Sequence, residues 1–483
     1  MSAWGGRRRV AVLGVGLLLA ACSASFKDPI NLPLVPDSAR VVPAGLPNVG
    51  GDTMVALAFS GGGTRAAAFA HGVMQGLDRI RADSRGTYFD KVTFISGVSG
   101  GSVAAVYYGL RGRAALADFR ERFLIKNAEE DLDTGLNFAN LTRGLQGGIN
   151  DASRLPGWLD RHLFDGATLG DLYQPGKPVV WVNASDLYNR TPFLFSPLTF
   201  TALCSDAWTY PLSQAVAASA AVPIGFVPIV LATFPDGCSA PLPPWVEAVL
   251  ADRNAGAQVR AFAMALKRYR DPGQIRYVKL SDGGLTDNFG LSGIVIARAA
   301  ADEPYAPLPR DKAVRLRRVV FIVVNAGLHS KGHWARTVQG PSGAEMLDAI
   351  TDTAINSAVR SGFDAFRFTL REWEDQTRKW RCRLPTREVA RFGVAADWRC
   401  SAINFDIVEL SFDQLDAERA ERLANVKTSL QLPSDEVDLV VGAGIDAVLA
   451  HPDLRRLLGR RNRLDASGAA VRDEPFTGAA ASR

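Results

Sequence analysis

The sequence predicts an α/β protein with a mostly parallel central sheet, followed by a mainly helical C-terminal region. Up to about residue 325, short apolar runs suited to buried strands alternate with helix-like stretches. Glycine-rich turns follow the first two apolar runs. Beyond that point the sequence shows helical periodicity with many charges. These observations favour parallel strands joined by crossover helices, with further helices packed on that body.

The elements are predicted in a regular order along the chain. Short apolar runs predict strands at residues 54–59, 92–95, 179–183, 277–280 and 319–324. Stretches of small and apolar residues follow the first two strands, and charged helical periodicity covers the C-terminal part. These patterns predict helices at residues 66–80, 102–110, 343–375 and 413–459.

The N-terminus is typical of a bacterial export signal. Three arginines at residues 7–9 precede an apolar run at residues 10–21, which is too short to cross a bilayer. The run ends in Leu-Ala-Ala-Cys, which resembles a lipoprotein signal. That resemblance implies removal of residues 1–21 and lipidation of Cys22. Ser23 follows Cys22, and by the same resemblance this residue favours anchoring of the protein in the outer membrane, on the side that faces the periplasm. We therefore expect the membrane as a partner, through Cys22.

Composition adds little about partners. Residues 22–52 are rich in Pro, Gly and Ser without a sustained period, which predicts a tether, and the small polar residues 465–483 predict a disordered tail. The formal charge of +5 falls to +5 − 3 = +2 when the three signal arginines are removed. This value is too small to predict nucleic-acid binding.

The cysteines outside the signal predict disulfides. An even number of cysteines in an exported chain favours pairing, and four cysteines allow three connectivities. The pairs Cys204–Cys238 and Cys382–Cys400 close the shortest loops, so loop entropy favours them. Neither pair has the C-x-x-C spacing of a zinc or redox motif.

A candidate nucleophile lies in residues 97–101, which read Gly-Val-Ser-Gly-Gly. A predicted strand enters this stretch and a predicted helix leaves it, which is the setting of a nucleophile elbow. The tight turn needs small residues on both sides, and Gly97 and Gly101 supply them. The helix N-terminus beyond it favours negative charge at a reacting centre. Ser99 is therefore the candidate nucleophile.

A second glycine turn follows the first predicted strand and consists of Gly61, Gly62 and Gly63. Such a turn presents backbone amides without obstruction, which suits an oxyanion hole. Arg65 lies close behind, and its guanidinium suits a substrate phosphate. A flexible turn and a solvent-exposed arginine are the plainer alternatives.

A serine nucleophile needs a proton acceptor, and Asp282 is the candidate. It directly follows a predicted strand, where partial burial raises the pKa of a carboxyl group and suits it to act as a base. The alternative is a turn aspartate that caps the next two glycines. A Ser-Asp-His triad using His329 also stays open, because His329 follows a predicted strand and this chain order is that of α/β-hydrolases.

Together these stretches resemble the patatin-like phospholipase family. The matching stretches occur in the family's order, at residues 61–65, 97–101, 217–223 and 282–284. The third is a block of small residues before an apolar Pro-Ile-Gly-Phe segment. The resemblance covers about residues 52–325. One departure is residues 285–289, where patatins often carry an Asn-Asn-Pro-like run, which puts the shape of that loop in doubt.

The resemblance implies a three-layer αβα fold and a specific chemistry. Ser99 would be the nucleophile and Asp282 the base of a dyad without histidine, with an acyl-serine intermediate and no metal or cofactor. The implied activity is that of a phospholipase A or lysophospholipase acting on phospholipid or a related lipid ester. The resulting division of the chain is signal 1–21, tether 22–52, catalytic domain 53–330, helical region 331–464 and tail 465–483.

Two readings from other classes compete with this one. Residues 61–66 also fit the G-x-G-x-x-A fingerprint of dinucleotide binding. That fingerprint requires an acidic residue at the end of the next strand, but here the next predicted strand leads into the Ser99 turn instead. A catalytically silent envelope lipoprotein is the other reading. The presence of both Ser99 and Asp282 argues against it.

Overall fold

The computed structural model describes residues 28–35, 51–84, 86–133, 140, 143–144, 147–327 and 333–459. The predictions for the signal, for Cys22, for His329 and for the tail lie outside these residues. Among the described residues, no helix combines the length and apolarity needed to cross a membrane.

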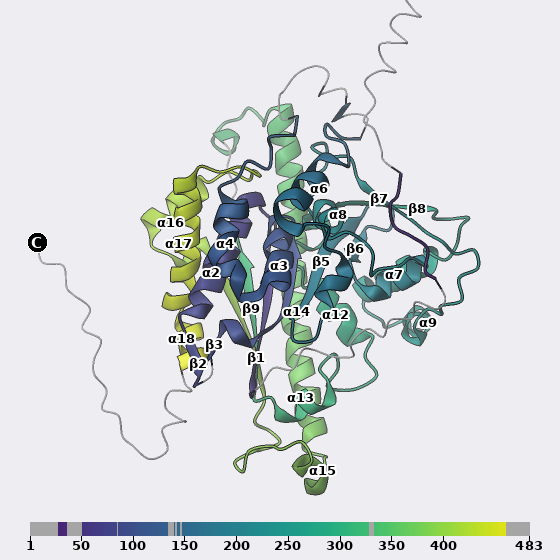
Figure 1. Cartoon of the computed structure of the whole chain (residues 1–483), viewed down its shortest axis with the longest axis vertical. Helices are drawn as coiled ribbons and strands as arrows, with labels where there is room; N and C mark the ends of the chain where they lie inside the picture. The colour runs from purple at the N-terminus through teal and green to yellow at the C-terminus, as the bar shows by residue number, and fades with distance from the viewer. Residues whose placement is uncertain are drawn as a thin grey trace, which may run out of the picture.

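One central sheet organises the molecule (Figure 1), in the order β10-β9-β1-β4-β5-β8-β7, with β6 paired to β5. The five strands from β10 to β5 are parallel, whereas β6 and β8 run antiparallel to β5 and β7 runs antiparallel to β8. The bounds are β1 Thr53–Phe59, β4 Val92–Val98, β5 Val179–Asp186, β6 Thr191–Leu194, β7 Ile229–Ala232, β8 Tyr277–Asp282, β9 Arg318–Asn325 and β10 Asn404–Ser411. A separate small hairpin pairs β2 Arg81–Asp83 with β3 Gly86–Thr87.

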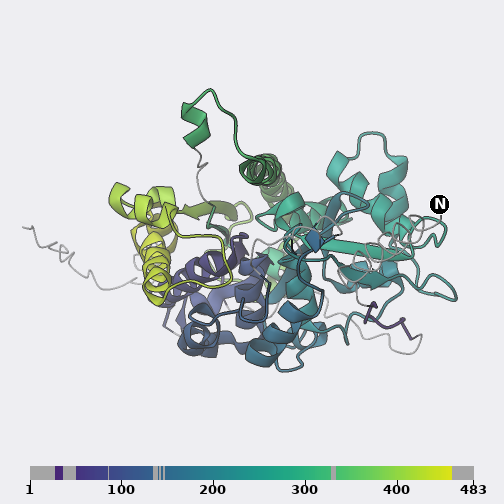
Figure 2. The ribbon, with the colours of Figure 1, turned by 90° about the horizontal axis from the view of Figure 1, so that it is seen from above.

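Helices cover both faces of this sheet, as Figure 2 shows from above. Successive β1 residues alternate between two apolar cores, with Leu57 in the core under α2 Gly63–Asp78 and α3 Gly100–Arg111. Ala58 belongs to the other core, under α12 Ser292–Ala299 and the long α14 Gly343–Arg381. The three-layer α/β prediction is therefore confirmed.

Within the described residues, the remaining α-helices are shorter than α14. They are α4 Ala115–Phe119, α6 Arg154–Leu159, α7 Pro197–Leu203, α8 Leu212–Ser219, α9 Pro244–Ala251, α10 Ala257–Arg268, α11 Gly284–Asp287, α13 Arg310–Arg315, α15 Thr386–Ala390, α16 Ala417–Ala424, α17 Ser434–Ala450 and α18 Pro452–Gly459.

The C-terminal region is mainly helical, as predicted, but it is built into the same body. Its strand β10 pairs in parallel with β9, and α17 packs on α2 with its apolar residues in the same core as β1. The contact between the two helices is close, because a side chain on Gly444 would place its Cβ 2.5 Å from the carbonyl oxygen of Phe69. The body formed by residues 53–330 and the C-terminal region therefore share one core.

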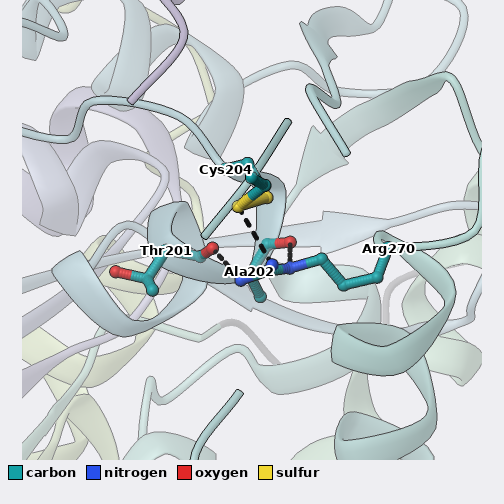
Figure 3. The surroundings of a disulfide bond; sticks show 5 residues. Thr201, Ala202, Cys204 and Arg270 are labelled. Carbon is teal, nitrogen blue, oxygen red and sulfur yellow. Dashed lines mark hydrogen bonds between the residues drawn. A yellow bond between two sulfur atoms is a disulfide. The ribbon is translucent and has the colours of Figure 1, made fainter. Parts of the chain in front are cut away.

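Two disulfides join the pairs that loop length favours. Cys204 is bonded to Cys238 and Cys382 to Cys400. Beside the first, Arg270 donates hydrogen bonds to the carbonyl oxygens of Ala202 (2.8 Å) and Thr201 (2.7 Å), as Figure 3 shows. This arginine thus ties the C-terminal end of α7 to the segment after α10.

Candidate active site

Ser99 lies at the sharp turn between β4 and α3. Its backbone has φ 51° and ψ −124°, a region that few residues other than glycine adopt. The glycines on either side are required by close packing. A Cβ on Gly97 would lie 2.6 Å from the Cα of Ser102, and one on Gly101 would lie 2.5 Å from the carbonyl oxygen of Ser60. The turn places Ser99 at the edge of the sheet where the parallel strands end.

Asp282, the last residue of β8, lies close to Ser99 because of the strand register. Val98 pairs with Asn183 of β5, and Asp282 pairs with the next β5 residue, Ala184, from the other side. The Ser99 hydroxyl donates a hydrogen bond to the Asp282 carboxylate, and the Gly284 amide donates a second at 2.8 Å. The structure thus brings together two residues that are 183 positions apart in the sequence.

The environment of Asp282 changes its proton affinity. Asp282 is 8% exposed as a residue and Ser99 is 7% exposed. Burial raises the pKa of Asp282 to about 6, although the hydrogen bonds from Gly284 and Ser99 both favour the charged form. The carboxylate is therefore largely ionised at neutral pH and still takes up a proton readily.

Ser219 links the two residues and was given no role by the sequence. Its buried hydroxyl accepts a hydrogen bond from the Ser99 amide (2.8 Å) and donates one to the carbonyl oxygen of Asn183 (2.6 Å). Its own carbonyl oxygen accepts from the Gly283 amide at 3.1 Å. The end of α8 thus fixes the backbone at the serine turn and directly after Asp282. The small-residue block at residues 217–223 was the only sequence signal near it.

The glycine turn after β1 lies beside Ser99, and its three amides are not equivalent. The Gly61 amide already donates to the backbone carbonyl oxygen of Asn288 (3.3 Å) and to its side-chain oxygen (3.1 Å). Within the described residues, the amides of Gly62 and Gly63 have no hydrogen-bond partner. A Cβ on Gly61 would lie 3.3 Å from that of Ser99. Gly62 and Gly63 are thus the turn amides left to bind an oxyanion.

A loop of the C-terminal region closes one side of this turn. The Thr64 amide donates to the carbonyl oxygen of Ser429 at 2.8 Å. Gly63 has φ 59°, and a Cβ there would lie 2.4 Å from the same oxygen. The Ser429 hydroxyl in turn donates to Glu129 at 2.7 Å. Residues beyond position 330 therefore shape the site directly.

The position of Arg65 does not support the predicted phosphate contact. The residue is 3% exposed, and burial lowers the pKa of its guanidinium to about 10. It donates hydrogen bonds to the carbonyl oxygens of Ala326 (3.0 Å) and Val426 (2.8 Å). Arg65 therefore ties α2 to the end of β9 and to the C-terminal region, because these two carbonyl groups would otherwise be buried without partners.

Two described histidines, His71 and His162, have their partners away from Ser99 and Asp282. His71 on α2 is buried between the Tyr108 hydroxyl (2.7 Å) and the Gln75 amide (3.0 Å), and burial lowers its pKa to about 4. His162 stacks on Trp158. Because His329 lies outside the described residues, the triad alternative is not tested by this geometry. No group of three or more His, Cys, Asp or Glu suited to a metal ion occurs in the described part of the chain.

An apolar cavity of about 590 Å³ lies between the sheet and α12, away from the serine turn. Phe94, Trp181 and Ile294 line it, whereas neither Ser99 nor Asp282 does. Phe94 precedes Ser99 by five residues on β4, which is about 16 Å along an extended strand. The cavity is therefore separate from the Ser99–Asp282 pair.

Comparison with known proteins gives a family match for the part of the chain that contains this site. The sequence model of the patatin-like phospholipase family matches residues 57–294, which include the glycine turn, Ser99 and Asp282. No curated protein matches the chain. Among solved structures the chain is similar to human GIVD cytosolic phospholipase A2, with 13% identity and a TM-score of 0.29. That alignment covers 56% of this chain and 45% of the human chain, so this chain spans less than half of the length of the human protein chain.

The family match covers just under half of the chain, so it defines the class of one domain and not of the whole protein. More specifically, residues 57–294 form a patatin-like phospholipase domain. The sheet that carries this domain continues past its end, because β9 and β10 complete it.

Proposed function

We propose that the protein hydrolyses a carboxylic ester of a phospholipid or lysophospholipid, with Ser99 as nucleophile and Asp282 as its base. One observation carries the proposal. The Ser99 hydroxyl donates a hydrogen bond to a buried carboxylate whose pKa is raised to about 6. A base of this pKa in direct contact with a hydroxyl is what proton transfer near neutral pH requires.

In the first step, the oxygen of Ser99 bonds to the ester carbonyl carbon as its proton passes to Asp282. The carbonyl oxygen becomes an oxyanion, and the amides of Gly62 and Gly63 stabilise it. The bond between the carbonyl carbon and the alcohol oxygen then breaks. The departing lysophospholipid or glycerophospho alcohol takes the proton from Asp282, and the acyl group stays on Ser99.

In the second step, water replaces the alcohol. The oxygen of the water bonds to the acyl carbon while Asp282 accepts a proton from that water. The amides of Gly62 and Gly63 stabilise the second oxyanion as they did the first. The bond to Ser99 breaks, a free fatty acid leaves, and the serine oxygen recovers its proton from Asp282. The aspartate thus alternates between base and acid, which a pKa near 6 permits.

We also propose that the protein is anchored in the bacterial envelope through lipidated Cys22, on the periplasmic side of the outer membrane. The N-terminal sequence pattern supports this placement. The two disulfides are compatible with it, because such bonds persist in an oxidising compartment.

Incubation of the pure protein with defined phospholipids, followed by mass spectrometry of the products, tests the activity. We expect free fatty acid and lysophospholipid from the wild type, and a loss of about 1,000-fold or more in Ser99→Ala and Asp282→Asn. Undiminished hydrolysis by both variants would contradict the proposed mechanism. Products from cleavage at a phosphate bond would contradict the proposed ester.

A further inference from the structure

Two neighbouring segments present large apolar side chains to solvent near the end of β5. Leu187 (43% exposed) and Tyr188 (61%) lie on the turn between β5 and β6, and Tyr277 (52%) begins β8. The Leu187 amide donates a hydrogen bond to the carbonyl oxygen of Lys279 at 3.1 Å, so the segments adjoin. We call the surface formed by Leu187, Tyr188, Arg190, Arg268, Tyr277 and Lys279 the hairpin patch.

The hairpin patch carries positive charge without paired acids. Arg190 and Lys279 are exposed and Arg268 is half-buried. None of the three forms a salt bridge with another described residue. Lys279 lies 5.1 Å from the ring centre of Tyr277. A hollow of about 480 Å³ opens beside Arg190 and Arg268, and no acidic residue lines it.

The turn at residues 187–190, which presents these side chains, is fixed by hydrogen bonds to a buried carboxylate. The buried Asp186 carboxylate accepts hydrogen bonds from the amides of Tyr188 (3.0 Å) and Asn189 (3.1 Å). It also accepts one from the hydroxyl of buried Tyr269 at 2.7 Å. Because the turn is fixed, the patch loses little conformational entropy when it binds a surface.

The patch lies at the same edge of the sheet as Ser99. β4 and β5 are parallel and end at Val98 and Asp186, so the turns that follow them leave the sheet on one side. β5, β6 and β8 lie side by side in Figure 1. Lys279 precedes Asp282 by three residues on β8.

We propose that the hairpin patch docks the protein on the surface of an anionic phospholipid bilayer. The tyrosines and Leu187 suit the boundary between headgroups and acyl chains, where amphipathic rings are favoured. Arg190 and Arg268 suit a headgroup phosphate in the hollow between them, and Lys279 adds attraction to anionic lipid. The inference rests on the proposed function, because docking there brings the Ser99 edge to its lipid substrate.

The test measures two quantities on the full chain. The first is the association rate with vesicles of ether-linked lipids, which an esterase does not cleave, made either of phosphatidylcholine alone or of phosphatidylcholine with phosphatidylglycerol in equal parts. The second is kcat on a water-soluble short-chain ester. The variant is Arg190→Glu/Lys279→Glu, and the control is Arg371→Glu/Arg383→Glu, which makes the same charge change at exposed residues in and after α14.

We expect the wild type to associate faster with the anionic vesicles, and the patch variant to lose about tenfold or more of that rate. Its kcat on the soluble ester, and both quantities for the control, should stay near wild type. Equal wild-type rates on both vesicles would overturn the proposal and leave an acidic protein surface as the alternative partner. An unchanged rate in the patch variant, or an equal loss in the control, would also overturn it. A wild type inactive on every ester would instead contradict the proposed function alone.

Discussion

At the scale of single residues, Ser99 depends on a backbone conformation that is costly for any side chain. A residue with this φ stores about 1–3 kcal/mol of strain, so its surroundings must hold it in place. The Ser219 hydroxyl does so by accepting a hydrogen bond from the Ser99 amide. This amide makes no hydrogen bond of a helix or a sheet in the described structure. The geometry of the Ser99–Asp282 pair therefore depends on a third residue, Ser219.

Ser219→Ala tests this dependence. Removing the hydroxyl leaves the buried Ser99 amide without a partner, at a cost of about 1–3 kcal/mol. We expect kcat to fall about tenfold or more with KM nearly unchanged, because Ser99 loses its alignment while the substrate surface stays intact. Steady-state kinetics on a soluble ester measure both parameters.

Two further variants make that result specific. Ser219→Thr keeps the hydroxyl and should recover part of kcat. Ser213→Ala removes another buried hydroxyl of α8 that bonds to neither Ser99 nor Asn183 in the described structure, and it should leave kcat unchanged. Equal kcat values for Ser219→Ala and Ser213→Ala would contradict the positioning role.

The raised pKa of Asp282 predicts opposite effects on activity and stability. Activity needs the ionised base, so kcat/KM should rise with pH and level off above about pH 6. The stability of the fold should instead decrease as pH rises. The pKa of Asp282 is higher in the folded protein than in the unfolded chain, so folding favours the protonated form of this carboxyl group. This contribution is fully present below the ordinary carboxyl pKa of 3.8 and is lost as pH rises through the folded-state pKa of about 6.

Asp282→Asn should therefore be inactive yet more stable at pH 8, by about 1–3 kcal/mol. Thermal unfolding of both proteins at pH 4 and pH 8 measures this, and the difference between them should shrink at the lower pH. An Asp282→Asn protein that is less stable than the wild type at pH 8 would contradict the burial argument.

Sequence patterns predicted Ser99 and Asp282, which the structure brings together, because both lie in short glycine-bounded turns after apolar runs. They did not find Ser219 or Asn288, whose contacts with Ser99 and Gly61 cross 120 and 227 positions of the chain. The same patterns predicted that Arg65 binds the substrate phosphate. Its burial beneath a C-terminal loop could not be predicted, because that loop is distant in sequence and leaves no pattern near Arg65.

At the scale of elements, all five predicted strands are present, and the two long-range disulfides join the favoured pairs. In the central sheet, the strands that sequence analysis missed are the edge strands β7 and β10 and the short β6, and it also missed the separate hairpin of β2 and β3. β10 reads Asn-Phe-Asp-Ile-Val-Glu-Leu-Ser, and its charges made it resemble the helical region around it. Edge strands need only partial burial, so their apolar pattern is weaker.

The contact of α17 with α2 offers a matched pair of glycine substitutions. A Cβ on Gly444 would lie 2.5 Å from the Phe69 carbonyl oxygen, whereas one on Gly442 meets nothing within 4 Å. We expect Gly444→Ala to destabilise the protein by about 1–3 kcal/mol through overpacking. Gly442→Ala should stabilise it by about 0.5–1 kcal/mol through helix propensity.

Denaturant unfolding of the two variants measures these free energies. Both substitutions add the same methyl group to the same helix, so their difference isolates the contact with α2. Equal effects in the two variants would contradict the close approach of α17 and α2.

At the scale of the whole molecule, the catalytic domain is not separable from the C-terminal region. The boundary at residue 330 came from a change in composition, and composition does not report that β10 extends the sheet. Across this boundary, Ser429 and Val426 accept hydrogen bonds from Thr64 and Arg65 beside the glycine turn. The site is therefore assembled only when both parts fold together.

A fragment of residues 51–330 should consequently fail to fold as an active enzyme. Its β9 would become an exposed sheet edge, and the apolar face of α2 would lose α17. We expect aggregation, or a soluble form with less than about 1% of wild-type activity. Expression of the fragment, with size-exclusion chromatography and an ester assay, measures this. A monomeric fragment with full activity would show that the C-terminal region is dispensable.

The central claim is that Ser99 forms a covalent acyl intermediate with a lipid. The most direct measurement is acid quenching of the reaction with a phospholipid that carries a labelled acyl chain, followed by peptide mass spectrometry. The account predicts the labelled acyl group on the peptide that contains Ser99, and no such adduct in Ser99→Ala. A labelled acyl group on another residue, or fatty acid release by Ser99→Ala at the wild-type rate, would contradict it.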